Sequence, residues 1–276
     1  MNVFKDFKAI SLGHYVNPAV TEKNTFKQLN NDNMTTKVNY TDLFKGRKLL
    51  SPGFTNAKTK KNELESFILY LSPADRNSKK VNICPAATAE CIKLCLNTSG
   101  HGAFDSVQRS RIERTEYYLN DRVGFINKLL NELFAIQKKA EKKGEKIAVR
   151  LNGTSDLDFI AIIKNRTGID ILEAMPNILF YDYTKLIGKV RKYAGTNYVL
   201  TFSRSEANEA ECIEALQLGA NIAAVFYKTL PAEYMGRPVV DGETSDLVMI
   251  QNRSTILGLK AKGRAKKVQQ SGFVIM

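Results

Sequence analysis

The feature that most constrains the fold is the alternation of apolar segments and amphipathic helices after residue 146. Apolar segments with strand-like composition cover residues 147–151, 178–181, 198–202, 221–226, 238–240 and 255–259, and residues 67–71 form an earlier one. Helical patterns lie between them, at residues 158–175 with an interruption near Gly168, at 186–193 and at 206–218. Such alternation predicts a parallel sheet covered by helices. Roughly six or seven units favour a partial or complete (β/α) barrel-like α/β fold, with an open doubly wound sheet as the alternative.

The first part of the chain differs from this pattern. Residues 1–60 are polar and weakly periodic, so we expect an irregular N-terminal extension followed by a single α/β domain over residues 61–276. Two helices are expected before the alternation begins. One covers residues 105–120, with Val107, Ile112 and Leu119 as its apolar face. The other starts at a capping Asp121 and ends beside Gly144.

Cysteines are concentrated in one short stretch. Cys84, Cys91 and Cys95 lie within twelve residues, and Cys84 follows the first apolar segment, residues 67–71, by 13 positions. Three thiolates this close can form one face of a metal or iron–sulfur site. The alternative is that small, apolar cysteines fill a tight turn. His101 follows in a Gly-bearing turn and is a candidate fourth ligand, proton carrier or loop residue without a role.

The fourth cysteine and the small number of histidines limit the kinds of metal site that the chain can form. Cys212 lies inside an amphipathic helical pattern and is expected to be a buried core thiol. The chain has only two histidines, His14 and His101, which excludes a metal site built on a His-x-His motif.

Polar residues follow the predicted strands. The carboxyl ends of parallel strands gather on one face, where active sites of α/β folds lie. We therefore expect catalytic roles for Asp156, Lys185 and Asp241, and cofactor or substrate binding by Asn152, Ser155, Lys260 and Lys262. Helix capping is the alternative for such residues, and it accounts for Ser203 and Ser205 but not for the lysines.

The charge balance favours an anionic partner. The chain holds 41 Lys and Arg against 28 Asp and Glu, a net charge of +13. A nucleotide, a nucleic acid or a phosphorylated small molecule would fit, and a solvated Lys-rich surface is the alternative. No apolar run is long enough for a membrane span, and residues 1–8 lack a secretory signal. The cysteines do not resemble a disulfide framework, so a reducing compartment, the cytoplasm, is expected.

Four motifs carry a resemblance to a known family. They are CPAATAECIKLC at residues 84–95, RLNGTSD at 150–156, YDYTK at 181–185 and GLKAKG at 258–263. In this order they resemble a family of phage- and prophage-encoded proteins related to the mycobacteriophage gene-88-type proteins. The resemblance covers roughly residues 50–276. It implies a phage protein but no particular reaction.

A looser similarity links the chain to radical S-adenosylmethionine enzymes. These place a three-cysteine [4Fe–4S] site in the loop after the first barrel strand, and the open fourth iron binds the methionine part of the cofactor. The resemblance implies a cluster on Cys84, Cys91 and Cys95, with S-adenosylmethionine as cofactor. The present spacing of six and then three residues between cysteines is wider than usual there, and Leu94 stands where an aromatic residue is usual.

Two functions from different classes follow. The first is an iron–sulfur, radical-type or metal-dependent enzyme acting on an anionic substrate such as a nucleotide or nucleic acid. The second is a phage nucleic-acid-binding or replication protein in which the cysteines are structural, with zinc as the alternative metal.

Overall fold

The structure is a computed structural model that describes residues 38–55, 64–267 and 271–276. All the elements below belong to one compact unit, Asn39–Met276. The predicted boundary at residue 60 stays a prediction, although Leu50–Pro52, inside the expected extension, forms the first strand of the sheet. His14 lies outside the described residues.

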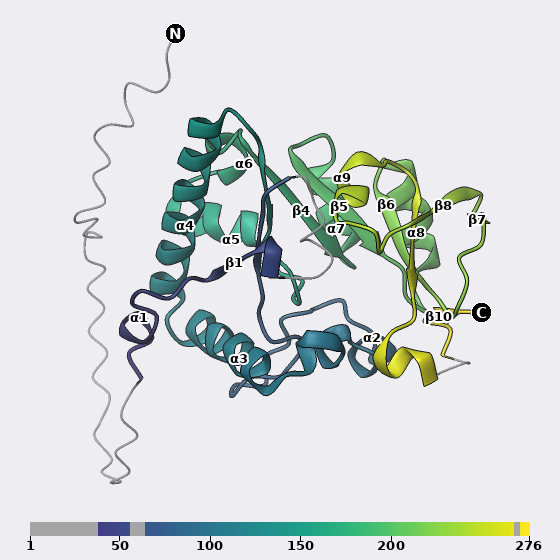
Figure 1. The fold of residues 1–276 in the computed structure, drawn as a ribbon, viewed down its shortest axis with the longest axis horizontal. Coiled ribbons are helices and arrows are strands. Elements are labelled where there is room, and N and C mark those ends of the chain that lie inside the picture. The colour runs from purple at the N-terminus through teal and green to yellow at the C-terminus, as the bar shows by residue number, and fades with distance from the viewer. Residues whose placement is uncertain (1–37, 56–63, 268–270) are drawn as a thin grey trace. The chain divides into compact units, whose positions relative to one another are not determined.

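The described residues form a mixed α/β fold around a 10-stranded sheet, which confirms the predicted α/β class (Figure 1). Seven strands are parallel neighbours, in the order β2 (Ser66–Leu69), β3 (Ile147–Arg150), β4 (Ile178–Thr184), β5 (Tyr198–Ser203), β6 (Asn221–Phe226), β9 (Ile256–Lys260) and β8 (Arg237–Asp241). Antiparallel strands stand at both ends, β1 (Leu50–Pro52) beside β2 and β7 (Glu233–Tyr234) beside β8. β10 (Val274–Ile275) pairs in parallel with β6.

The sheet is open. Its order starts at β1 and ends at β7, and these two strands do not pair in the part of the chain that the structure describes, so the predicted barrel is not confirmed. From β2 to β6 the strands nevertheless follow one another in chain order. Because crossovers between parallel strands are right-handed, such an order sends the connecting helices to one face. The doubly wound alternative reverses its strand order near the middle and does not match.

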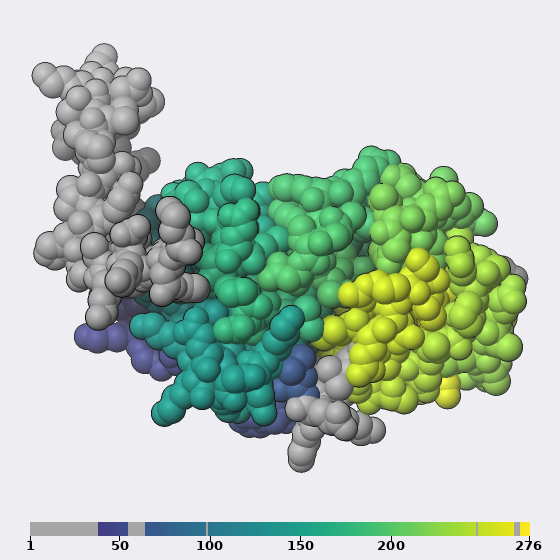
Figure 2. Space-filling model, turned by 90° about the horizontal axis from the view of Figure 1, so that it is seen from above, coloured from purple at the N-terminus to yellow at the C-terminus, as the bar shows by residue number. Residues whose placement is uncertain are grey.

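Helices connect and flank the strands. They are α1 (Tyr40–Leu43), α2 (Ala89–Lys93), α3 (Asp105–Asn120), α4 (Arg122–Lys143), α5 (Phe159–Thr167), α6 (Ile171–Ala174), α7 (Ile187–Tyr193), α8 (Glu209–Gln217) and α9 (Leu247–Gln251), with 3-10 turns η2 (Gly53–Thr55), η4 (Leu96–Thr98), η5 (Gly100–Ala103) and η6 (Gly263–Lys267). The colours in Figure 2 pass from teal through green to yellow-green across one face, as expected when successive βα units lie side by side. No helix in the described ranges is long and apolar enough to cross a membrane.

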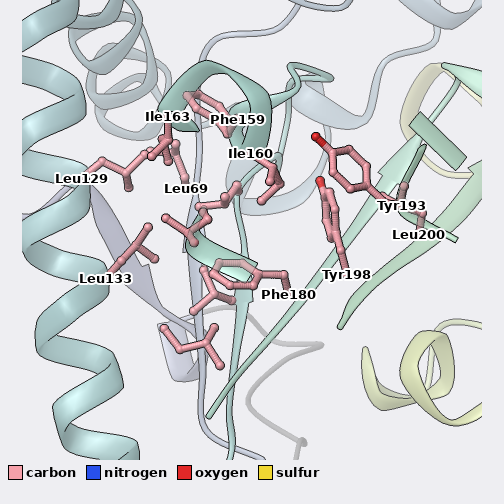
Figure 3. Close-up of a cluster of buried hydrophobic side chains, with 14 of the residues drawn as sticks. Leu69, Leu129, Leu133, Phe159, Ile160, Ile163, Phe180, Tyr193, Tyr198 and Leu200 are labelled. Atoms are coloured by element: carbon pink, nitrogen blue, oxygen red, sulfur yellow. The ribbon is translucent and has the colours of Figure 1, made fainter. Parts of the chain in front are cut away.

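One face of the sheet buries most of the apolar core. Leu129 and Leu133 of α4 face Phe159 and Ile163 of α5, and Phe180 of β4 completes the layer (Figure 3). A smaller cluster lies on the opposite face, where Tyr181, Val199 and Leu257 pack with Met249 of α9. Successive side chains of each strand therefore pack into the clusters on opposite faces of the sheet, as the period of two in a strand requires.

Helix α4 forms as the sequence predicts. The Asp121 carboxylate accepts the Gly124 N–H at 2.9 Å and caps the first turn. Gly144 ends the helix in the left-handed conformation, with φ +68°, which glycine adopts without steric cost.

The predicted apolar face of α3 is only partly correct, because Leu119 packs against the core but Ile112 does not. Ile112 is 40% exposed, whereas Arg111, Thr115, Tyr117 and Tyr118 are buried. Thr115 accepts the Ser72 N–H at 2.7 Å and donates to the Arg111 carbonyl at 2.8 Å. A polar face of α3 is buried because it holds the segment that leads from β2 to the cysteines.

Candidate active site at the carboxyl edge of the sheet

Cys84 lies where the chain returns to the carboxyl ends of the strands. Its thiol accepts the Ala74 N–H at 3.4 Å and donates to the Thr154 carbonyl at 3.8 Å. The Asp156 N–H donates to the neighbouring Ile83 carbonyl at 3.0 Å. These contacts attach the cysteine segment to the loop that follows β3.

Cys91 and Cys95 lie on and just after α2. Thr88 caps this short helix by accepting the Cys91 N–H at 3.2 Å. The Lys185 ammonium, just after the end of β4, lies close enough to Cys91 to oppose the rise in the pKa of its thiol that burial causes. Lys185 Nζ also lies 5.7 Å from the ring centre of Phe273, near the C-terminus. The predicted site lysine therefore lies near a predicted ligand cysteine.

The three cysteines influence one another's ionisation. Burial raises the pKa of Cys84 to about 11, and the charges of Asp156, Cys95 and Cys91 act in the same direction. Burial also raises the pKa of Cys91, which Lys185 opposes. In this environment the two thiols keep their protons at neutral pH unless a cation compensates the thiolate charge.

The chemistry of the three cysteines favours metal binding, but the positions of their side chains do not. Thiolates are the ligands that iron–sulfur clusters and structural zinc prefer. Within residues 38–55, 64–267 and 271–276, however, no three His, Cys, Asp or Glu side chains meet as a group that could hold an ion. The three cysteines lie on one short segment but their side chains do not converge on one point in this structure, so a shared metal would require them to reorient.

Asn152, Ser155 and Asp156 form a buried hydrogen-bond network in the turn after β3. The Asn152 N–H and Nδ2 donate to the two oxygens of Asp182 at 2.8 and 3.0 Å. Ser155 Oγ donates to Asn152 Oδ1 at 2.9 Å. Asp182 belongs to β4, which extends to Thr184 and so runs three residues beyond the predicted strand end.

Asp156 connects this turn to β4 and α7. Its carboxylate accepts the Thr184 hydroxyl and the Lys185 N–H at 2.8 Å each, and Lys189 Nζ at 3.2 Å. Lys189 is itself buried. The predicted residues of the β3 and β4 ends thus lie together beside Cys84 and Cys91, with Asp156 holding the backbone of Lys185 in place.

The other predicted residues gather farther along the same edge. β5, β6 and β9 lie between β4 and β8 in the sheet, so Asp241 stands at a distance from Lys185. Lys262 Nζ pairs with Glu243 Oε1 at 3.1 Å, and the Lys260 N–H donates to the same carboxylate at 3.0 Å. Asp241 accepts the Glu243 N–H at 2.8 Å. Glu243 therefore supplies the carboxylate that a lysine at a strand end requires.

Several residues that support the site were not predicted. Gln108 Nε2 donates to the Asn97 carbonyl at 2.5 Å, and the Arg111 guanidinium donates to the Asn97 side chain. Arg111 also stacks 5.1 Å from the ring centre of Tyr70. A β-carbon on Gly102 would stand 3.1 Å from the Asn97 carbonyl oxygen. Gly102, in the predicted turn, therefore allows a close approach to the protein's own loop. The sequence signal that could have revealed these supporting residues is the run of polar residues on α3.

A buried charged cluster on the other face of the sheet was also missed. Arg150 lies 3.7 Å from Asp182 and 3.9 Å from Asp246, and its guanidinium is 4.8 Å from the ring centre of Tyr183. Tyr181 donates its hydroxyl to Asp246 at 3.0 Å. Burial opposes the charge on Arg150, but the two carboxylates outweigh it and raise its pKa.

Three further predictions have clear outcomes. Cys212 is fully buried in α8, which confirms a core thiol. Ser203 and Ser205 are not caps, because α8 starts at Glu209 after Asn208 and Ser205 instead donates its N–H to Asn208 Oδ1 at 2.6 Å. His101 is exposed and stacks on Phe104.

A pocket also lies at the opposite edge of the sheet. Residues at the amino ends of β5 and β6 line it, together with the end of α7 and Arg253. It is therefore remote from the cysteine loop. The active sites of α/β folds lie at the carboxyl ends of the strands, so we place the candidate site at the cysteine loop.

The fold and the site define a mixed α/β protein with a cysteine-bearing loop over the carboxyl edge of a parallel sheet. A family model described as Gene product 88 matches residues 41–275, so the chain belongs to this phage gene-product family. The predicted family resemblance is confirmed. Comparisons with curated proteins and with solved structures gave no match. The similarity to radical S-adenosylmethionine enzymes is not supported by these comparisons.

Proposed function

We propose that this protein is an iron–sulfur or other metal-dependent enzyme of the radical S-adenosylmethionine type, acting on an anionic substrate. One observation carries the proposal. The three-cysteine loop follows the first parallel strand and lies over the carboxyl ends of strands that run in chain order from β2 to β6. This is the edge at which α/β enzymes build their sites.

Each residue of the site has a proposed role. Cys84, Cys91 and Cys95 would hold the cluster, and S-adenosylmethionine would be the second cofactor. A cluster held by these cysteines would supply electron transfer at this loop. Asn152 and Ser155 shape the turn that would receive cofactor or substrate, since their own polar atoms hold the backbone between β3 and β4.

Lys185 is the residue best placed to act on a bound group. Asp156 fixes its backbone, Phe273 lies beside its ammonium, and its positive charge opposes the rise in the pKa of the Cys91 thiol that burial causes. We infer that Lys185 holds an anionic group of the substrate next to the cysteine loop, with Asp156 positioning it. Lys260, Lys262 and Asp241 would contact a more distant part of the same substrate, such as the phosphates or ribose of a nucleotide or nucleic acid.

Purification without oxygen tests this function. We expect stoichiometric iron and acid-labile sulfide and a broad absorption near 400 nm, which is an approximate value for iron–sulfur proteins. Reduction should bleach the absorption. Protein without iron or sulfide after anaerobic purification and reconstitution would refute the iron–sulfur enzyme.

A second function is favoured by a specific observation. Residues 260–267 carry five exposed basic side chains, which suits a nucleic-acid-binding or replication protein with structural cysteines. In that case the purified protein should be colourless and contain about one zinc ion. Under either function the thiols need a reducing compartment, and we propose the host-cell cytoplasm.

A further inference from the structure

A strip of basic residues lies beside the cysteine loop. Lys260, Lys262, Arg264, Lys266 and Lys267 are all exposed, and no acidic residue interrupts the segment. We call these five residues the basic strip. Five cations in eight residues repel one another, so their clustering costs free energy unless an anion lies against them.

The basic strip is held in place by its small residues. Ala261 and Ala265 are buried and pack with Leu94, which lies between Cys91 and Cys95. Gly263 has φ +53°, and a β-carbon there would stand 2.9 Å from Ser99 Cβ. Figure 1 accordingly shows the yellow coil of η6 beside α2. The strip therefore presents its charges from a fixed position next to the candidate site.

An aromatic pair lies in the same loop as Ser99. The rings of His101 and Phe104 stack with centroids 5.4 Å apart and an interplanar angle of 23°. Phe104 is 57% exposed and His101 is also exposed. A large exposed aromatic ring contributes little to the packing of the core, but a nucleic-acid base can stack on its flat face.

The carboxylates near the basic strip and the aromatic pair neutralise only part of the positive charge. Glu243 pairs with Lys262 at 3.1 Å, and Asp105 follows Phe104 at the start of α3. In the described ranges, no ion pair involves the other four cations of the strip. Basic side chains that track a backbone, combined with an aromatic platform, are the combination by which proteins bind single-stranded nucleic acids.

We propose that the basic strip and the His101–Phe104 pair form a binding site for single-stranded nucleic acid, which leads the strand to the cysteine loop. The phosphates would contact the basic strip and one or more bases would stack on the aromatic pair. In a duplex the phosphates would be accessible, but the bases would be stacked on one another and could not stack on the aromatic pair. This inference takes the anionic substrate of the proposed enzyme to be a polynucleotide, yet binding to the site requires no metal.

Fluorescence anisotropy with a labelled oligothymidylate of about 20 nucleotides tests the site, since one binding module covers a shorter stretch than this. The triple variant R264Q/K266Q/K267Q should bind at least about tenfold more weakly at low salt. Its slope of log affinity against log salt should fall by about 2, because each phosphate contact on a single strand contributes about 0.7. The variant K138Q/K142Q/K146Q removes the same charge from the end of α4 and its adjoining turn and should bind as the unmodified protein does.

The aromatic pair has its own variants. Phe104→Ala should weaken binding about tenfold without changing the salt slope, because a stacked base contributes roughly 1–3 kcal/mol. Phe104→Tyr keeps a ring and should retain affinity. Since the side chain is largely exposed, neither change affects the core.

Three results would overturn the proposal. They are no binding of the oligonucleotide at low salt, an equal loss in the α4 control, and duplex binding as tight as single-strand binding with no effect of Phe104→Ala. Iron content separates this inference from the proposed function. Protein that holds iron but does not bind the oligonucleotide contradicts only the inference, whereas iron-free protein that binds it contradicts only the iron–sulfur enzyme.

Discussion

Gly153 shows how a single residue constrains the candidate site. A β-carbon at this position would stand 2.6 Å from the ring of Tyr70 and 2.7 Å from Ile68. The turn after β3 and the end of β2 can approach this closely only because residue 153 has no side chain. The same turn carries Asn152 and Thr154, so it connects the strand end to Cys84.

Replacing Gly153 with alanine should therefore destabilise the protein. We expect the free energy of unfolding to fall by about 1–3 kcal/mol, the usual cost of overpacking. Gly188 is the matched control, because its added β-carbon would meet nothing within 4 Å and alanine is favoured over glycine in a helix by about 1 kcal/mol. Urea unfolding of both variants makes the comparison, and equal stability changes would contradict the packing of this turn.

Asp156 offers a second test at the level of the residue. Asp156→Asn keeps the size of the side chain but leaves the buried Lys189 without its carboxylate. We expect a loss of about 3–5 kcal/mol, as found when one partner of a buried ion pair is removed. Lys164→Gln breaks an exposed pair with Asp170 and should cost less than about 1 kcal/mol. Chemical denaturation measures both, and a mild effect of Asp156→Asn would show that the ion pair does not stabilise the β3–β4 connection.

Among the elements, α5 and α7 are joined through one carboxylate. Asp158 caps α5 by accepting the Ala161 N–H at 3.1 Å, and it also accepts the Tyr193 hydroxyl at 2.7 Å and Lys192 Nζ at 3.0 Å. Burial opposes its charge, but these donors outweigh burial, so the pKa of Asp158 lies below its ordinary value of 3.8. The charged form therefore stabilises the folded state.

The sign of the pH dependence follows from this lowered pKa. The stabilisation by Asp158 is complete above pH 3.8, its ordinary value, and is lost as the pH falls further through the lower folded value. We expect Asp158→Asn to lose about 1 kcal/mol at neutral pH. The difference between the two proteins should shrink in acid, measured by urea unfolding at a series of pH values. A difference that grows in acid would contradict the assigned charge state.

The elements that the sequence predicts best are those with a long, clear period. The strands β3, β5, β6 and β9 and the helix α4 begin and end within one or two residues of expectation, because apolar runs and capping residues mark them. β1, β7 and β10 have only two or three residues each, too few to show a period. The buried face of α3 was missed because tertiary contacts with Asn97 and Ser72 bury Arg111 and Thr115, whereas Ile112 stays exposed.

At the scale of the whole molecule, the rule that parallel strands end on one face predicted part of the site. It correctly brings Asn152, Ser155, Asp156 and Lys185 to one edge, since β3 and β4 are neighbours. The rule could not predict how far Asp241 lies from them, because the local sequence pattern does not determine the order of the strands in the sheet. The partners Glu243 and Phe273 depend on the same long-range order.

The central claim is that Cys84, Cys91 and Cys95 together hold a metal centre. Iron bound per chain, measured after anaerobic reconstitution of the unmodified protein, Cys91→Ser and Cys212→Ser, tests it most directly. Cys212 is buried in α8, so its serine variant controls for the loss of one thiol. We expect iron to be lost in Cys91→Ser and retained in Cys212→Ser. Iron content that Cys91→Ser leaves unchanged, or an unmodified protein that binds none, would contradict the account.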